Sequence, residues 1–65
     1  MALTPFLNRA QRSQLIDEFI EFMYEIDENY SEDQERADRE WLSRLNNNKF
    51  VNAVTDQMPD ALLFI

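Results

Sequence analysis

The chain has 65 residues and a net charge of −7, and it contains no glycine, cysteine or histidine. Without histidine or cysteine it lacks the commonest proton shuttle, the strongest biological nucleophile and the preferred ligands of zinc and iron. Without glycine it cannot build a phosphate-binding loop or a nucleophile elbow in their usual forms. These absences favour a non-enzymatic protein without a cofactor or metal, which acts by contacting another macromolecule.

A chain of this size forms a single domain, 1–65, and it is small for a stable core. Since disulfides are impossible and 45% of the residues are hydrophobic, we expect self-association to supply the missing stability. Acidic residues number 13 against 6 basic ones, so nucleic-acid phosphates should repel the surface, and direct nucleic-acid binding is not expected. The sequence shows no signal peptide and no apolar run of about 20 residues, which predicts a cytoplasmic protein without a membrane contact.

The first predicted helix spans about residues 5–29. Thr4 and Pro5 predict its start, because threonine is a good N-cap and proline is favoured in the first turn. An apolar stripe about 160° wide runs along it, broader than the ~100° stripe of an ordinary surface helix. One neighbouring helix cannot cover such a stripe and two are expected to, so we predict that it packs across the two-fold axis of a homodimer. The stripe consists of Leu15, Ile16, Phe19, Ile20, Phe22, Met23, Ile26 and Tyr30.

The opposite face of this helix is acidic. Its carboxylates recur every three or four residues and form a continuous ridge along the helix. We call this set the acidic ridge: Asp17, Glu18, Glu21, Glu25 and Glu28. The acidic ridge either keeps a small apolar protein in solution or presents negative charge to a basic partner.

A second helix is predicted over about residues 32–45, which makes a helical hairpin with the first. Ser31 and Gln34 fit a capping box at its start. Three Glu-to-Arg pairs at the favourable spacing of four residues support it, namely Glu32 with Arg36, Glu35 with Arg39 and Glu40 with Arg44. Trp41 lies on its apolar face and is a candidate interface anchor, because tryptophan is enriched in such positions.

A short third helix is predicted over about residues 49–57. The run 46–48 is all asparagine, which tolerates the left-handed conformation that ends a helix, and Asn48 can cap the helix that follows. The apolar tail at 60–65 is expected to fill the fold or to clip onto a partner through Leu62 and Phe64. Arg12, on the apolar side of the first helix, is expected to mark the start of the buried stripe or to pair with a carboxylate across the dimer.

Residues 27–33 alternate oxygen-bearing side chains in the manner of a calcium-binding loop. Such a loop requires glycine at its sixth position and a bidentate glutamate at its twelfth. Here those positions hold Glu32 and Asp38, so the pattern fails where the geometry matters most.

Two acidic pairs, Glu18-x-x-Glu21 and Glu35-x-x-Asp38, are similar to the paired acidic motif of the all-α nucleotide pyrophosphohydrolases. The resemblance implies a magnesium site that would hold a nucleoside triphosphate. Because Glu18 and Glu21 lie opposite the apolar stripe, we expect them to face water instead. A metal-dependent nucleotide pyrophosphohydrolase therefore stands as the alternative function.

As a whole the chain resembles the small acidic helical accessory proteins that lambda-like temperate phages express early, in its length, acidity, helical-hairpin pattern and lack of catalytic residues. The resemblance implies a regulator of host or phage proteins during lytic development and transfers no site residues. The residues themselves predict a regulatory adaptor or inhibitor that binds an unidentified protein partner through the acidic ridge or leftover apolar surface. In a variant of this hypothesis, the carboxylates imitate the phosphates of a nucleic acid and occupy a basic site.

Overall fold

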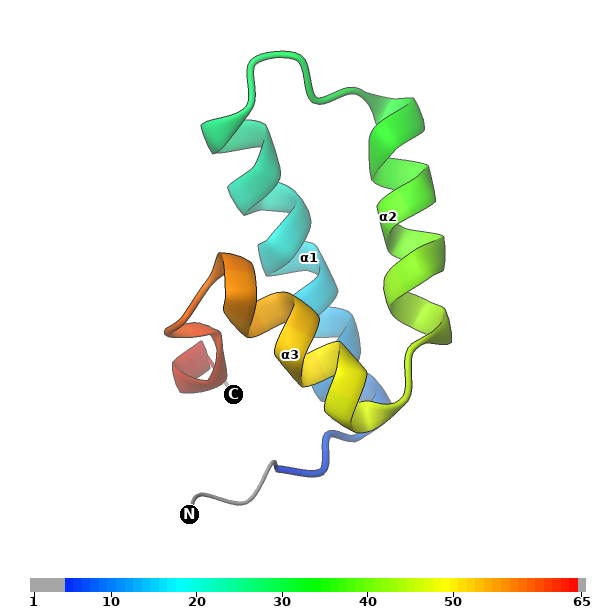
Figure 1. The fold of residues 1–65 in the computed structure, drawn as a ribbon, viewed down its shortest axis with the longest axis vertical. Helices are drawn as coiled ribbons and strands as arrows, with labels where there is room; N and C mark the ends of the chain where they lie inside the picture. Colours follow the sequence, from blue (N-terminus) through cyan, green and yellow to red (C-terminus); the bar gives the residue numbers. More distant parts are fainter. Residues whose placement is uncertain (1–4, 65) are drawn as a thin grey trace.

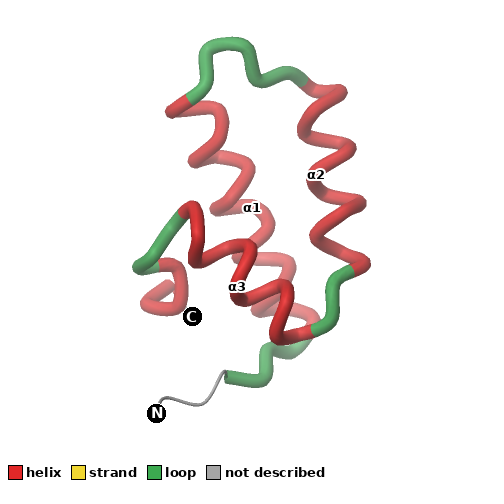
Figure 2. Tube along the Cα trace, in the orientation of Figure 1, coloured by secondary structure: helices red, strands yellow, loops and turns green. Residues whose placement is uncertain are grey.

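The computed structural model describes residues 5–64, and this range contains three α-helices, one short 3₁₀ helix and no β-strand. Helices α1 (Arg9–Ile26) and α2 (Glu32–Arg44) form a hairpin, α3 (Asn47–Gln57) crosses one face of α1, and the 3₁₀ helix η1 (Ala61–Phe64) packs against α1 and α3 (Figures 1 and 2). The predicted all-α class and helical hairpin are confirmed. None of the helices in this range has the length and apolar character that crossing a bilayer requires.

Helix α1 begins at Arg9 and ends at Ile26, so it is shorter at both ends than the predicted span of 5–29. Asn8 starts it, because its Oδ1 accepts the backbone N–H of Gln11 at 2.8 Å while Gln11 Oε1 accepts the backbone N–H of Asn8 at 2.9 Å. This reciprocal capping box satisfies two backbone donors that the helix cannot pair internally. Pro5 precedes the helix in a non-helical segment, and the predicted cap Thr4 lies outside the described residues.

Helix α2 agrees with its predicted span to within one residue. The Ser31 hydroxyl accepts the backbone N–H of Gln34 at 3.4 Å, as a capping serine does. The Gln34 side chain does not complete the predicted capping box, because its Nε2 donates to Asp38 Oδ1 at 3.2 Å. The cap at Ser31 is therefore one half of the motif that the sequence suggested.

Helix α3 begins at Asn47, because Asn46, and not Asn48, is its N-cap. Asn46 Oδ1 accepts the backbone N–H of Lys49 at 2.9 Å. The prediction of a left-handed asparagine between the second and third helices was wrong, since no residue in the described range has a positive φ. Extended backbone at Leu45 and Asn46 joins the two helices instead.

The core lies where α2, α3 and η1 pack on α1. Burying a large apolar side chain stabilises the fold by about 1.5–3 kcal/mol. The four largest side chains without exposed surface are Phe50, Leu15, Leu42 and Val54. The other buried members are Leu7, Phe19, Ile20, Tyr30, Val51 and Ala61. The core therefore draws on every helix and on the segment before α1.

The apolar stripe of α1 is largely covered within one copy of the chain, which corrects the predicted homodimer interface. Leu15, Phe19, Ile20 and Tyr30 are each at most 7% exposed, and the half-buried members are Ile16, Phe22 and Met23. Two neighbours cover the stripe, as its width requires, but α2 and α3 both belong to the same chain. Only Ile26, which is 56% exposed at the end of α1, remains open.

The predicted tail at 60–65 fills the fold through its first residues. Ala61 has no exposed surface, and its N–H is donated to the Met58 carbonyl at 2.9 Å, which turns the chain back after α3. Leu62 is half-buried and packs against the core, while Leu63 is 81% exposed. The side chain of Phe64, predicted as an interface residue, lies outside the described part of the chain.

Candidate functional site

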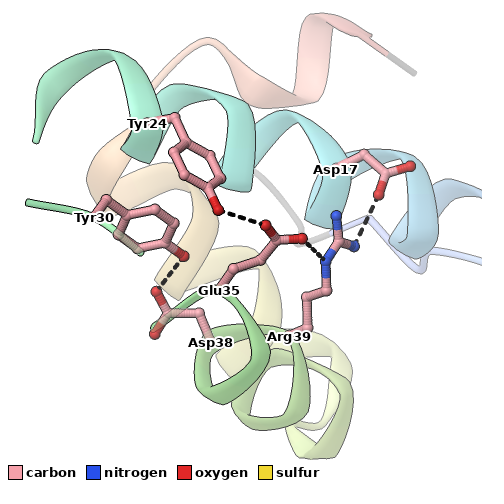
Figure 3. A network of polar contacts seen from close by, with 6 residues as sticks. All are labelled: Asp17, Tyr24, Tyr30, Glu35, Asp38 and Arg39. Atoms are coloured by element: carbon pink, nitrogen blue, oxygen red, sulfur yellow. Dashed lines mark hydrogen bonds and ion pairs between the residues drawn. The ribbon is translucent and has the colours of Figure 1, made fainter. Parts of the chain in front are cut away.

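A network of polar side chains joins the two arms of the hairpin (Figure 3). Arg39 of α2 donates from Nη1 to Asp17 Oδ1 at 2.9 Å and from Nε to Glu35 Oε2 at 2.8 Å. The other oxygen of Glu35 accepts the hydroxyl of Tyr24 from α1 at 2.8 Å. Hydrogen bonds from Arg39, and then from Tyr24, lower the pKa of the Glu35 carboxyl. The bond to this carboxylate in turn raises the pKa of Tyr24.

Tyr30 makes a second, more buried link at the turn end of the hairpin. Its hydroxyl donates to Asp38 Oδ2 at 2.7 Å, and its ring meets the Tyr24 ring edge-on with centres 4.8 Å apart. Burial, followed by the bond to Asp38, raises the pKa of Tyr30 well above its ordinary value. Both tyrosine hydroxyls therefore keep their protons and donate hydrogen bonds to α2, Tyr24 from α1 and Tyr30 from the turn that follows α1.

This network accounts for the second acidic pair of the pyrophosphohydrolase pattern. Glu35 and Asp38 each accept a tyrosine hydroxyl, so their oxygens hold the hairpin together. Of the first pair, Glu18 is half-buried and Glu21 is exposed on α1. Within residues 5–64, no three acidic side chains converge in a way that could hold a metal ion. The geometry therefore gives the hydrolase alternative no support.

The loop at 27–33, whose residue pattern is like that of a calcium-binding loop, is held in shape by hydrogen bonds to its first residue, Asp27. Asp27 Oδ1 accepts the backbone N–H of Asn29 at 2.9 Å, a local hydrogen bond typical of an Asx turn. The Tyr30 N–H then donates to the Asp27 carbonyl at 3.1 Å. These two bonds explain the polar residues here as turn formers between α1 and α2.

The acidic ridge divides into a paired residue and a free set. Asp17 is held to α2 by its ion pair across the hairpin. Glu18 is half-buried, whereas Glu21, Glu25 and Glu28 are exposed, and no ion pair to them occurs within the described residues. Glu21 and Glu25 lie in the half of α1 that leads to the hairpin turn, whereas Glu28 lies in the turn itself, because α1 ends at Ile26 and not at the predicted residue 29. Glu21, Glu25 and Glu28 are therefore accessible, but only Glu21 and Glu25 belong to the helix.

Trp41 lies over a shallow groove formed by all three helices. The groove has a volume of about 360 Å³, with the buried Phe19 ring contributing from α1 and Lys49, Ala53 and Asp56 from α3. Trp41 itself is 47% exposed. Of the predicted interface residues at this groove, Phe19 thus lies in the core and Trp41 keeps a free face.

Arg12 pairs with no carboxylate among residues 5–64 and contacts backbone carbonyls instead. Its Nη2 donates to the carbonyl of Leu45 at 2.6 Å and to that of Leu42 at 3.2 Å. These carbonyls end α2, where backbone acceptors lack intrahelical donors. The only signal for this role in the sequence was an arginine on the apolar side of a helix, and spacing rules cannot identify a partner 30 residues away.

Comparison with known proteins finds no family model, no curated sequence and no solved structure that matches this chain.

Proposed function

We propose that this protein is a non-enzymatic regulatory adaptor or inhibitor that binds a basic surface on a protein partner. The observation that carries this proposal is the state of Glu21, Glu25 and Glu28, which are exposed without an ion pair in the described range. Carboxylates that hold this fold together have partners, as Asp17 and Glu35 do. Carboxylates without such partners remain available to cations on another molecule; Glu21 and Glu25 lie one helical turn apart on α1, and Glu28 lies in the turn that follows.

Apolar surface beside the acidic ridge adds to its suitability for a partner. Ile26 is 56% exposed and Tyr24 is 42% exposed, and both belong to the same half of α1 as Glu21 and Glu25. Protein interfaces combine an apolar centre with a polar rim in this way. Carboxylates alone would give fast and salt-sensitive encounters, whereas apolar contacts supply lasting affinity.

The charge along the chain favours a basic partner. Residues 13–35 contain nine Asp and Glu residues and no Lys or Arg. A field of one sign over one part of the surface speeds association with the opposite sign. The resemblance to early accessory proteins of lambda-like temperate phages supports the same proposal, which we extend to a cytoplasmic regulator of lytic development.

The test compares retention of partners from a bacterial lysate by immobilised wild-type protein and by two double variants. Glu21→Lys with Glu25→Lys changes the ridge, and Glu40→Lys with Asp60→Lys makes the same charge change at exposed positions outside the ridge and the Trp41 groove. We expect a saturable partner whose retention falls about tenfold with the ridge variant and less than about threefold with the control. Circular dichroism checks that both variants fold.

Two results would contradict the proposal. One is the absence of any partner whose binding saturates, and the other is equal loss of the partner with both double variants. The second result would mean that overall charge, and not the ridge, attracts the partner.

Nucleic-acid mimicry is a narrower form of the same proposal. If the free carboxylates take the place of phosphates on the partner, a DNA duplex of about 20 base pairs should displace the protein competitively, with a strong salt dependence. Partner binding that persists unchanged at saturating duplex would exclude mimicry and leave the adaptor.

Self-association enters the proposal in a changed form, because the stripe of α1 is covered within one copy. We propose that the free face of Trp41 provides the contact between copies, by entering the groove of a second copy in a two-fold arrangement. Sedimentation equilibrium should then show a weak dimer that Trp41→Ser weakens. Unchanged association in that variant would exclude this contact.

A further inference from the structure

A pocket of about 560 Å³ lies beside the N-terminal end of α1, away from the hairpin turn. Its lining includes Arg9, Arg12 and Arg39, which are half of the six basic residues in the chain. No Asp or Glu occurs among the described residues that line it. In a protein with a net charge of −7, this surface has the opposite sign from its surroundings.

The positive charge of two of these arginines is not neutralised by a carboxylate. Arg9 is exposed, and no ion pair to it or to Arg12 occurs in the described range. The partners of Arg12 are backbone carbonyls, which carry no net charge. Arg39, by contrast, is held by Asp17 and Glu35. The pocket therefore presents two guanidinium groups without a carboxylate partner in the described range, and guanidinium is the group best suited to pair with a carboxylate.

Apolar and hydroxyl-bearing side chains complete the lining. Phe6 is 85% exposed at the pocket, Ile16 is half-buried, and Ser13 and Ser43 add hydroxyl groups. A ligand that fits this lining needs a carboxylate with an apolar group next to it. The volume is within the range of ligand sites, about 300–1,000 Å³.

We propose that this pocket binds an acidic peptide segment of a protein partner, in which an Asp or Glu lies next to an apolar side chain. Arg9, assisted by Arg12, pairs with the carboxylate, and the free face of Phe6 covers the apolar group. A peptide suits the pocket better than a small molecule, because small-molecule sites enclose about 70–90% of their ligand and this pocket is open to solvent.

The acidic ridge does not prevent an acidic ligand from binding here, because Asp17, its first member, is already paired with Arg39 and the exposed members lie farther along the chain. Arg9 and Glu25 are 16 residues apart in α1, which corresponds to about 24 Å at 1.5 Å per residue. The Debye length is about 8 Å at physiological salt, so repulsion from the far end of the ridge is largely screened. The two ends of α1 then bind partners of opposite charge. The pocket is a second site and does not depend on the partner of the ridge.

The test selects peptides from a random hexapeptide library displayed against the folded full chain. We expect enrichment of sequences in which Asp or Glu is adjacent to Leu, Ile, Phe or Met. Fluorescence anisotropy then measures the enriched peptides against Arg9→Glu, Phe6→Ser and the control Arg44→Glu, which makes the same charge change at an exposed site outside the pocket. Affinity should fall about tenfold with either pocket variant and less than about threefold with the control.

Each other outcome overturns the proposal. The pocket has no such ligand if the library shows no preference for acidic residues, or if Arg9→Glu binds the enriched peptides as tightly as the wild type. Concentration-dependent association that Arg9→Glu abolishes would identify a second copy as the occupant instead. The double variant Glu21→Lys with Glu25→Lys should keep peptide binding, so the failure of the pocket and of the ridge can be told apart.

Discussion

The guanidinium carbon of Arg12 lies over the ring of Phe50, 4.5 Å from its centre, while Nη2 of the same side chain donates to the carbonyls of Leu42 and Leu45. One residue of α1 thus contacts the C-terminal end of α2 and the first turns of α3. The carbonyls at a helix C-terminus carry the negative end of the helix dipole, so a cation is favoured there. Phe50 has no exposed surface, and Arg12 covers it on one side.

The Arg12→Met substitution should lower the free energy of unfolding by about 2–3 kcal/mol. Hydrogen bonds from a charged donor contribute about 1.5–3 kcal/mol, and a cation–π contact contributes about 0.5–2 kcal/mol. Methionine keeps apolar contact with Phe50, which limits the loss to the lower part of the summed range. Urea denaturation followed by Trp41 fluorescence measures the change.

Arg44→Met is the control for Arg12→Met, because the side chain of Arg44 is 76% exposed and pairs only with Glu40 within the described residues. Exposed ion pairs contribute about 0.3–0.5 kcal/mol at this helical spacing. An equal loss of stability in the two variants would show that Arg12 does not join the three helices energetically.

Asn47 holds the segment before α1 against the start of α3. Its Nδ2 donates to the Pro5 carbonyl at 2.7 Å, and its Oδ1 accepts the N–H of Leu7 at 2.9 Å. Asn47→Ala removes both bonds and should lower the free energy of unfolding by about 1–2 kcal/mol. Hydrogen exchange at the Leu7 amide should accelerate about tenfold or more, because this segment then opens locally.

Asn48→Ala provides the matched control, since Asn48 is exposed on the following position of the same helix. It should change stability by less than about 0.5 kcal/mol. Unchanged exchange at Leu7 in Asn47→Ala would mean that burial of the Leu7 side chain alone, at 3% exposed, holds the segment in place.

The helices were predictable because their signals are local. Ser31 at the cap and glutamate–arginine pairs four residues apart placed α2 to within one residue. The start of α1 was not predictable in this way, because two capping patterns compete for it. Thr4 with Pro5 and Asn8 with Gln11 each satisfy the rules for a helix start. The bonds from Asn47 hold Pro5 and Leu7 outside the helix, and a contact across 40 residues is not visible in either local pattern.

The width of the α1 stripe correctly predicted two neighbours but not their origin. Hydrophobic spacing shows how much surface a helix must bury, and it does not show whether the cover belongs to the same chain. Here the extended link at Leu45 and Asn46 turns α3 back over α1. The same limit applies to the sites. The exposure of Glu21 and Glu25 follows from spacing along α1, whereas the arginine pocket requires Arg39 from α2 to lie near Arg9.

Tyr30 should make the fold sensitive to alkaline pH. The native state holds the Tyr30 proton more tightly than the unfolded chain, because burial and the bond to Asp38 raise its pKa above the ordinary value of 10.0. Its contribution is therefore complete below about pH 10 and is lost as the pH rises further. Tyr30→Phe should cost about 1–2 kcal/mol near neutral pH and should lose less stability than the wild type between about pH 8 and pH 11.

Urea denaturation at the two pH values measures this effect, with Tyr24→Phe as the comparison. The pKa of Tyr24 is raised as well, chiefly by its bond to Glu35, but its side chain is 42% exposed. The loss of stability between the two pH values should therefore be reduced more, relative to the wild type, in Tyr30→Phe than in Tyr24→Phe. The reverse order would assign the sensitivity to the outer tyrosine.

Glu35 should make the fold sensitive to acid. Hydrogen bonds from Arg39 and Tyr24 lower its pKa below the ordinary value of 4.5, so the native state favours the ionised carboxylate. Its contribution is present above about pH 4.5 and is lost as the pH falls through the lower native value. Glu35→Gln should narrow the difference in Tm between about pH 6 and pH 3, measured by circular dichroism. Glu32→Gln, an exposed neighbour in the same turn of α2, should keep the difference of the wild type. If Glu35→Gln keeps it too, other carboxylates cause the acid sensitivity, and the network of Figure 3 does not set it.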